Sequence, residues 1–158
     1  MTEKVPHTVL GLIEKPDMVV MQFRPNMPGK LAYPGKIHFF GGHLNPGEAP
    51  YAGLVREIGE ETNLDIPAAP AGPELWSGRY MGENRRGEKV LRHITLFALA
   101  ELLPADQEVV VSTREGGATI EIAKDLGVIE DLREHIAPFA YQALTSYLSP
   151  DGKVTIGE

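Results

Sequence analysis

The sequence predicts an α/β fold in which a β-sheet is covered by one early and one late helix. Its length of 158 residues suits a single domain. Runs of β-forming residues bracket two helical segments, and 17 glycines with 13 prolines indicate short strands and many turns rather than a helical bundle. We therefore expect residues 1–158 to form one mixed α/β domain.

The chain opens with a predicted hairpin. Residues 8–14 and 18–23 are rich in β-forming side chains, and a Lys-Pro-Asp turn separates them. Residues 25–36 contain three prolines and two glycines, which predicts a loop. Residues 37–40 are expected to form a short strand that runs into a pair of glycines.

The middle of the chain predicts a helix followed by two strands. Residues 50–62 should be helical, because Pro50 suits the first helical position, where a missing N–H costs nothing. Residues 66–73 contain three prolines and one glycine and predict a loop. Strands are expected at about 74–81 and 89–100, and the nearly continuous apolar character of the second predicts a central strand.

The C-terminal part predicts a long helix with an interruption. Apolar side chains recur at three- to four-residue steps over residues 126–148, which is typical of a helix with one buried face. Pro138 should kink this helix or split it in two. A Ser-Pro-Asp-Gly turn at 149–152 then leaves a short polar tail.

Composition excludes several classes of function. The 15 lysines and arginines against 22 acidic residues give a net charge of −7, which disfavours nucleic acids and anionic membranes as partners. The absence of cysteine excludes disulfides, thiolate metal sites and cysteine nucleophiles. No stretch approaches the roughly 20 apolar residues of a membrane helix, and the N-terminus does not have the pattern of a signal peptide. We expect a cytoplasmic protein.

The segment 42–64 carries the chemistry. On a helical wheel, Glu57, Glu60 and Glu61 share one narrow face, and Arg56 lies on its flank. The opposite face, which we expect to pack on the core, contains Ala52, Val55, Ile58 and Gly59. Like charges at this spacing repel by a few tenths of a kcal/mol per pair. The triplet alone is either a solvated acidic face or a site for Mg²⁺ or Mn²⁺, which prefer oxygen ligands.

This segment resembles the Nudix box, G-x5-E-x7-R-E-U-x-E-E-x-G-U, where U is aliphatic. Eight of the nine fixed positions match. Six of them are the identities Gly42, Glu48, Arg56, Glu57, Glu60 and Glu61. The departure is Asn63 in place of the second glycine. A left-handed turn commonly follows a helix, and Asn tolerates that conformation next best after Gly, so we expect Asn63 to replace it without loss.

The residues before the box are similar to the family's P-G-x-W-x-F-P-G-G segment. Residues 34–42 match it except that Ile37 replaces the Trp and Phe40 replaces the Pro. The opening hairpin, which ends at Arg24, is similar to the first strands of the family. The resemblance implies a Nudix-like α/β/α sandwich around a mixed β-sheet.

The resemblance also implies an activity. Members of the Nudix family mostly hydrolyse a nucleoside diphosphate linked to another group, cleaving a phosphoanhydride bond with a divalent metal. By this resemblance Mg²⁺ (or Mn²⁺) is held by Glu57, Glu60, Glu61 and the backbone carbonyl of Gly42. Arg56 belongs to the catalytic set with Glu57 and Glu60, and it can pair with Glu48 to hold the loop against the helix.

A general base in this family often comes from a glutamate outside the box. Glu115 is favoured here because glycines follow it, and Glu121, in a strand-like stretch, is the rival. Glu60 within the box is a third candidate. A non-catalytic Nudix-like nucleotide-binding or sensor module is the alternative to an enzyme, and the intact box glutamates favour the enzyme.

Three residues are expected to bind a small-molecule nucleotide: Arg24, His43 and Tyr80. His43 adjoins the first box glycine and is placed to touch phosphate, and a tyrosine near position 80 recurs in dinucleoside-polyphosphate hydrolases of the family. The basic segment 79–93 is either a phosphate-contacting hairpin or a solvated hairpin tip. The remaining histidines are expected to be structural, and a homodimer is left open.

Overall fold

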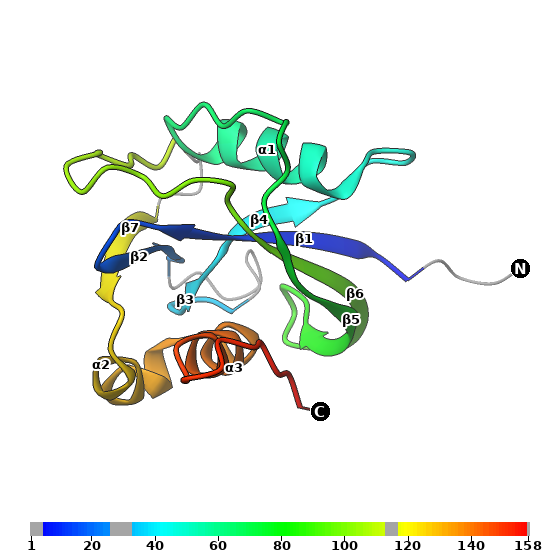
Figure 1. Cartoon of the computed structure of the whole chain (residues 1–158). Coiled ribbons are helices and arrows are strands. Elements are labelled where there is room, and N and C mark those ends of the chain that lie inside the picture. Colours follow the sequence, from blue (N-terminus) through cyan, green and yellow to red (C-terminus); the bar gives the residue numbers. More distant parts are fainter. Residues whose placement is uncertain (1–4, 26–32, 113–116, 158) are drawn as a thin grey trace, which may run out of the picture.

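The computed structural model describes residues 5–25, 33–112 and 117–157 (Figure 1). In chain order the elements are β1 (His7–Glu14), β2 (Met18–Phe23), β3 (Ile37–His38), β4 (Phe40–His43), α1 (Pro50–Glu61), β5 (Glu74–Glu83), β6 (Lys89–Ala98), β7 (Ala118–Ala123), α2 (Leu126–Asp131), the 3₁₀ turn η1 (Arg133–His135) and α3 (Pro138–Tyr147).

The strands form one mixed sheet with the order β3-β2-β1-β6-β5, with β7 beside β2 and β4 beside β1. β1 and β6 are parallel, and the other pairs are antiparallel. β1 changes partner along its length, because Thr8 to Gly11 pair with β4 whereas Ile13 and Glu14 pair with β2. This exchange brings the glycines of β4 to the middle of the molecule, beside the N-terminal half of β1.

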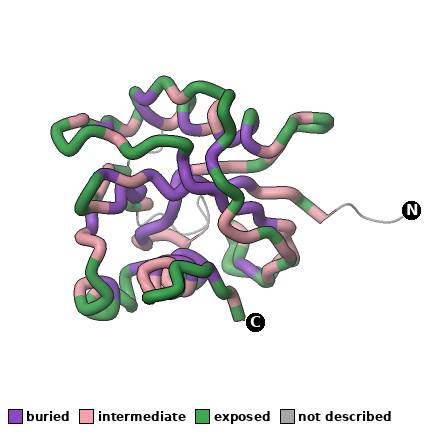
Figure 2. The backbone as a smooth tube through the Cα atoms, in the orientation of Figure 1, coloured by how far each residue is buried: buried purple, intermediate pink, exposed green. Residues whose placement is uncertain are grey.

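Helices cover both faces of the sheet: α1 lies on one side, and α2 and α3 lie on the other (Figure 1). Side chains of β1 alternate between the two faces. Val9 and Ile13 pack with Leu54 of α1, whereas Leu10 and Leu12 pack with α3. Figure 2 shows the buried segments running between the helix layers. The predicted α/β/α sandwich around a mixed sheet is therefore confirmed.

Most predicted elements are confirmed. The hairpin of β1 and β2 and the helix α1 are present, residues 66–73 lie outside helices and strands, and β6 is central because it pairs with β1 and β5. The segment 126–148 is split as expected: α2 ends at Asp131, and α3 begins at Pro138.

The tail after the turn at 149–152, which the sequence predicts to be short and polar, packs against the rest of the protein. Val154 is buried in the core cluster that contains α3, and Thr155 donates its N–H to the Ser146 hydroxyl at 2.9 Å. The tail is therefore docked on α3. Over the described part of the chain, none of the helices has the length and apolar character needed to cross a membrane.

Candidate active site

The face of α1 that packs on the sheet differs from the expected one. Tyr51, Leu54 and Ile58 are buried, whereas Ala52 and Gly59 are exposed. Only Ile58 of the four residues expected on the packed face is fully buried, and Val55 is half-buried. The large side chains determine the face, because burying Ala or Gly removes little apolar area from water.

Because this face of α1 packs on the sheet, the three box carboxylates lie in different environments. On the helix, Glu57 and Glu61 lie beside the buried Leu54, so they face the sheet rather than solvent. The side chain of Glu57 is 17% exposed, whereas that of Glu60 is 60% exposed. Of the two alternatives for the triplet, a solvated acidic face does not describe all three carboxylates, because only Glu60 projects into solvent.

The two inward-facing carboxylates lie against the glycines of β4. Glu61 accepts a hydrogen bond from the Gly41 N–H at 3.1 Å. A Cβ atom at Gly42 would lie 2.5 Å from the Glu57 carboxyl carbon, closer than side chains tolerate. Glycine at position 42 therefore allows the backbone of β4 and the Glu57 carboxylate to approach each other closely.

Arg56 lies at the centre of the box ion pairs rather than on the flank of the acidic face. It donates to both carboxylate oxygens of Glu48, from Nε at 2.8 Å and from Nη2 at 2.9 Å. Nη1 donates to Glu57 at 3.0 Å and to Glu60 at 3.3 Å. Nη2 also donates to the carbonyl oxygen of His43 at 3.2 Å. Arg56 thus ties the loop before α1 to the helix and relieves part of the carboxylate repulsion.

The box carboxyl groups have different pKa values because their surroundings differ. Hydrogen bonds from Arg56 and from the Asn45 N–H lower the pKa of Glu48 to about 2. Burial raises the pKa of Glu61 to about 7, although the Gly41 N–H opposes the shift. Burial also raises the pKa of Glu57, against the effect of Arg56. The charged forms of Glu57 and Glu61 are therefore poorly solvated.

The box carboxylates are not gathered as metal ligands in this structure. Glu57 and Glu60 turn toward Arg56, and Glu61 turns toward β4. Over residues 5–25, 33–112 and 117–157, no group of three or more His, Asp or Glu side chains is spaced to hold a metal ion. Metal binding at the box therefore stays a prediction.

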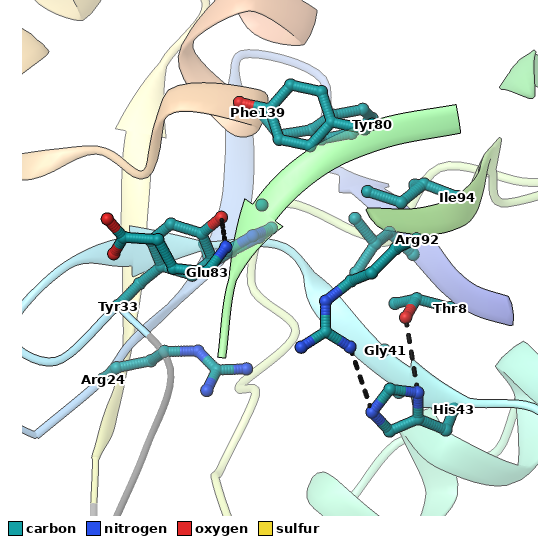
Figure 3. Close-up of a pocket in the computed structure, with 14 residues that line it drawn as sticks. Thr8, Arg24, Tyr33, Gly41, His43, Tyr80, Glu83, Arg92, Ile94 and Phe139 are labelled. Atoms are coloured by element: carbon teal, nitrogen blue, oxygen red, sulfur yellow. Dashed lines mark hydrogen bonds between the residues drawn. The ribbon is translucent and has the colours of Figure 1, made fainter. Parts of the chain in front are cut away.

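A cavity of about 200 Å³ adjoins the same glycines (Figure 3). Gly41 and Gly42 line it, so the β4 backbone forms a wall shared by the cavity and the box carboxylates. Its apolar lining is Leu10, Tyr80, Ile94 and Phe139. Its polar lining is Thr8, Arg24, Tyr33, His38, His43, Glu83 and Arg92. The cavity combines aromatic surface with cationic groups.

Two histidines of the cavity have lowered pKa values. His43 Nε2 lies 3.4 Å from Arg92 Nη1, and burial with the Arg92 charge lowers the His43 pKa. His38 is buried, and its Nδ1 accepts the Phe39 N–H at 2.8 Å. Burial lowers the pKa of His38 to about 3. Its Nδ1 is an acceptor, so the neutral His38 ring has its proton on Nε2.

The structure brings the predicted substrate-binding residues together. Arg24, His43 and Tyr80 come from three separate segments, and all of them line the cavity. The sequence did not single out Tyr33, Glu83, Arg92 or Phe139 as cavity residues, and His38 was expected to be structural. The charge of segment 79–93 was the available signal for Arg92, but it did not distinguish the strand residues of the hairpin from its turn.

The basic segment 79–93 combines both of its predicted alternatives. Tyr80, Glu83 and Arg92, on the paired strands β5 and β6, line the cavity. Arg85 and Arg86, in the turn at the tip, are exposed. Only the strand residues of the hairpin are therefore placed to contact a ligand in this cavity.

Of the two candidate bases outside the box, only Glu121 is among the residues that the structure describes. Glu115 lies outside the described residues. Glu121 lies on β7 and pairs with Lys15 at 2.9 Å, where the Lys15 side chain is only 5% exposed. Glu121 therefore serves as the counter-ion of a buried lysine, and it does not line the cavity.

Asn63 does not adopt the left-handed conformation expected from the missing glycine. Among the described non-glycine residues, only Tyr33 has a positive φ. Asn63 instead binds the segment around residue 110: its Oδ1 accepts the Val110 N–H at 2.8 Å, and its Nδ2 donates to the Glu108 carbonyl at 3.0 Å. Asn therefore supplies side-chain hydrogen bonds that Gly cannot make.

Comparison with known proteins gives a family match. The family model for the NUDIX domain matches residues 5–135. The MutT protein from Methanosarcina mazei Go1 is similar in structure, with a TM-score of 0.67 and 18% identity over 97% of this chain and 99% of that chain. A MutT protein from Bacillus halodurans has a TM-score of 0.65 and 16% identity over 94% of this chain and 86% of that chain.

A larger protein is also similar. It is the bifunctional NMN adenylyltransferase/ADP ribose pyrophosphatase from Francisella tularensis, in complex with AMP and a Mn ion, with a TM-score of 0.64 and 20% identity over 93% of this chain. The chain spans 42% of the length of that protein. At these identities the structural likenesses establish the fold. No curated protein matches the chain in sequence.

Proposed function

The chain belongs to the Nudix hydrolase family, and from this membership we propose that it cleaves a phosphoanhydride bond in a nucleoside diphosphate linked to another group. The observation that carries the proposal is the shared wall of Gly41 and Gly42. The box glutamates Glu57 and Glu61 contact it from α1, and a cavity with aromatic and cationic residues adjoins it. A phosphate group beside this wall would lie close both to the box glutamates and to the cavity residues.

A divalent cation fits the chemistry of the box. Glu57, Glu60 and Glu61 offer carboxylate oxygens, and Gly42 offers a carbonyl oxygen, which are the ligands that Mg²⁺ and Mn²⁺ prefer. Burial raises the pKa values of Glu57 and Glu61, so a cation beside them stabilises their charged forms. A bound Mg²⁺ or Mn²⁺ supplies charge neutralisation for the phosphates and a bound water of lowered pKa.

Arg56 has a positioning role in this proposal. It holds Glu48 with two hydrogen bonds and still contacts Glu57 and Glu60. If Glu57 and Glu60 turned from Arg56 to hold a metal ion, the two hydrogen bonds to Glu48 would still keep the arginine in place. Arg56 thereby fixes the position of α1 relative to the loop that carries His43.

Water activation is assigned to Glu115 as general base. Its position late in the chain, followed by glycines, is typical of the extra glutamate in this family. Glu121 is a weaker candidate because Lys15 binds its carboxylate and thereby reduces its basicity. Glu60, which is largely exposed, stays the rival within the box.

Arg24, His43 and Tyr80 are proposed to bind the nucleotide. Arg24 lines the cavity, and its charge opposes the upward pKa shift that burial gives Glu61. His43 is the residue after Gly42, at the end of β4. The Tyr80 ring packs edge-on against the Phe139 ring, with 5.2 Å between the ring centroids. Phosphate is therefore expected near Arg24 and His43, with the nucleoside toward Tyr80.

The alternative is a nucleotide-binding module without catalysis. Such modules tend to lose box carboxylates, whereas Glu48, Glu57, Glu60 and Glu61 are all present here. The solved neighbours include a bifunctional NMN adenylyltransferase/ADP ribose pyrophosphatase, so ADP-ribose is one of the first substrates to test. A small-molecule nucleotide in the cytoplasm is the partner we propose.

A substrate screen tests this function. Purified protein with Mg²⁺ is incubated with nucleoside triphosphates, nucleoside diphosphate sugars, ADP-ribose and dinucleoside polyphosphates, and the released nucleoside monophosphate and pyrophosphate are measured. We expect turnover of at least one class by the wild type and none by the Glu57→Gln variant. Binding of nucleotides without turnover of any class would favour the non-catalytic module.

A further inference from the structure

Tyr33 has an uncommon backbone conformation beside the cavity. Its φ is 51°, a region that bulky L-residues seldom occupy. The residues after it are tied in place: the Lys36 N–H donates to the Tyr33 carbonyl at 3.2 Å, and the Lys36 ammonium donates to the Glu134 carbonyl. A strained conformation of this kind persists only where the surrounding structure holds it.

The Tyr33 hydroxyl supplies part of that support. It accepts a hydrogen bond from the Glu83 N–H at 2.9 Å, so the phenol reaches across to the end of β5 (Figure 3). Gly82 makes room for this contact, because a Cβ atom there would lie 2.8 Å from the Tyr33 oxygen. Among the described residues other than its two chain neighbours, no other atom lies closer than 3.7 Å to that Cβ position.

The ring of Tyr33 lines the cavity together with two other aromatic side chains. Tyr80 and Phe139 lie on another side of the cavity, and Arg92 lies between the aromatic groups and His43 (Figure 3). Planar bases stack on aromatic side chains, and arginines bind phosphate. A volume of about 200 Å³ is smaller than the usual range for a drug-sized ligand, so it suits one part of a nucleotide.

We propose that Tyr33 is the residue that positions the nucleobase of the substrate, by closing the cavity where β5 ends at Glu83. This inference rests on the proposed function, because it concerns the nucleotide of that reaction. The hydrogen bond to the Glu83 N–H fixes the phenol, and the fixed ring sets the orientation of a planar base relative to the shared wall. Tyr33 acts on substrate placement and takes no part in the cleavage.

Two substitutions disturb this contact from opposite sides. Tyr33→Phe removes the hydrogen bond and keeps the ring, whereas Gly82→Ala pushes the phenol away and keeps the hydroxyl. We expect each to raise KM about threefold to tenfold with kcat changed less than twofold, because one neutral hydrogen bond is lost. Tyr33→Leu removes the aromatic surface and should raise KM further, by about tenfold or more.

The double variant is the critical measurement. Without the hydroxyl, the alanine side chain at position 82 meets no close atom, so Tyr33→Phe/Gly82→Ala should have the KM of Tyr33→Phe alone. Tyr147→Phe is the matched control, since it loses a phenol hydrogen bond of 3.0 Å to Glu14 and does not line the cavity. Its KM should equal that of the wild type.

A binding arm separates this inference from the proposed function. The chain has one tryptophan, and the Trp76 ring lies 5.6 Å from Phe139, which lines the cavity. Titration of the four ribonucleoside monophosphates without metal, followed by Trp76 fluorescence, should give Kd values about threefold to tenfold weaker for Tyr33→Phe. Inorganic pyrophosphate, which has no base, should bind both proteins equally.

The outcomes are distinct. Absence of turnover by the wild type on every substrate overturns the proposed function, and the monophosphate titration then still decides on Tyr33. The inference is overturned if Tyr33→Phe and Gly82→Ala keep KM and Kd within twofold of the wild type. It is also overturned if their effects add in the double variant, or if kcat falls while KM stays constant.

Discussion

The two sides of the Gly41–Gly42 wall are built in different ways. On the α1 side, the functional groups come from one segment of 23 residues, and Arg56 organises them through contacts within that segment. On the cavity side, the groups come from β1, β3, β4, β5, β6, α3 and the segment between β2 and β3. One side is therefore a local motif, and the other depends on the whole fold.

This difference predicts whether a substitution should change the chemical step or substrate binding. Changes on the α1 side should affect the rate of the chemical step, because that side holds the carboxylates. Changes on the cavity side should affect substrate binding, because that side holds aromatic and cationic groups. Substitutions on the two sides test this division.

Loss of an inward-facing carboxylate should reduce turnover most. We expect Glu57→Gln and Glu61→Gln to lower kcat by about 10³-fold or more, since each removes a proposed metal ligand. Electron paramagnetic resonance of added Mn²⁺ should also show weaker binding by both variants. Glu74→Gln, on an exposed part of β5, is the control and should retain wild-type kcat and Mn²⁺ affinity.

Glu61→Gln has a further effect on stability that depends on pH. The folded-state pKa of Glu61 is raised to about 7, so the stability that its protonated form provides is lost as pH rises through that value. Without metal, the melting temperature of Glu61→Gln should therefore exceed that of the wild type at pH 8 and approach it at pH 5. A large drop at both pH values would show that Glu61 is structural.

The general base comes next in size. Glu115→Gln should lower kcat by about 10²–10⁴-fold at saturating Mg²⁺, with little change in metal affinity. Glu121→Gln should keep kcat and instead lose about 1–2 kcal/mol of stability, because the buried Lys15 loses its partner. Urea denaturation and steady-state kinetics on both variants separate the roles. Loss of turnover in Glu121→Gln alone would transfer the role of base to Glu121.

Arg56→Lys should have an intermediate effect. Lysine keeps the charge but cannot make the two parallel hydrogen bonds to Glu48, so the loop and α1 lose their fixed relation. We expect kcat to fall about 10- to 100-fold, as for other residues that orient metal ligands. Arg133→Lys, at an exposed ion pair with Glu130, is the control and should behave as the wild type.

The smallest effect is expected on the cavity side. Arg92→Gln should raise KM about threefold to tenfold and leave kcat nearly unchanged, because it removes a cation that lines the cavity. Arg85→Gln, at the exposed hairpin tip, provides the matched control. A fall in kcat of more than tenfold for Arg92→Gln would contradict the division between the two sides.

The sequence predicted the local side of the site better than the assembled side. The spacing of Glu48, Arg56 and the three later glutamates defines the box without knowledge of the fold. The phase of α1 was wrong because Ala52 and Gly59 were counted as core positions, whereas the bulkier Tyr51 and Leu54 determine which side packs. Helical periodicity shows which residues share a face of the helix, but it counts small and large apolar residues alike.

The cavity could be predicted only in part because its residues meet through strand pairing. Thr8 lies opposite His43 on β4 and opposite Ile94 on the parallel strand β6. These pairings join positions far apart in the chain, and no local pattern specifies them. No local pattern predicted Tyr33 as a cavity residue either, because its hydrogen-bond partner Glu83 is 50 residues away.

The central claim is that the box carboxylates catalyse nucleotide hydrolysis with a divalent cation. The most direct test measures hydrolysis of the best substrate by the wild type in Mg²⁺, in excess EDTA, and after Mg²⁺ is restored. Our account predicts turnover in Mg²⁺, none in EDTA and full recovery, because Glu57 and Glu61 without a cation repel the polyphosphate. Undiminished turnover in excess EDTA would contradict it.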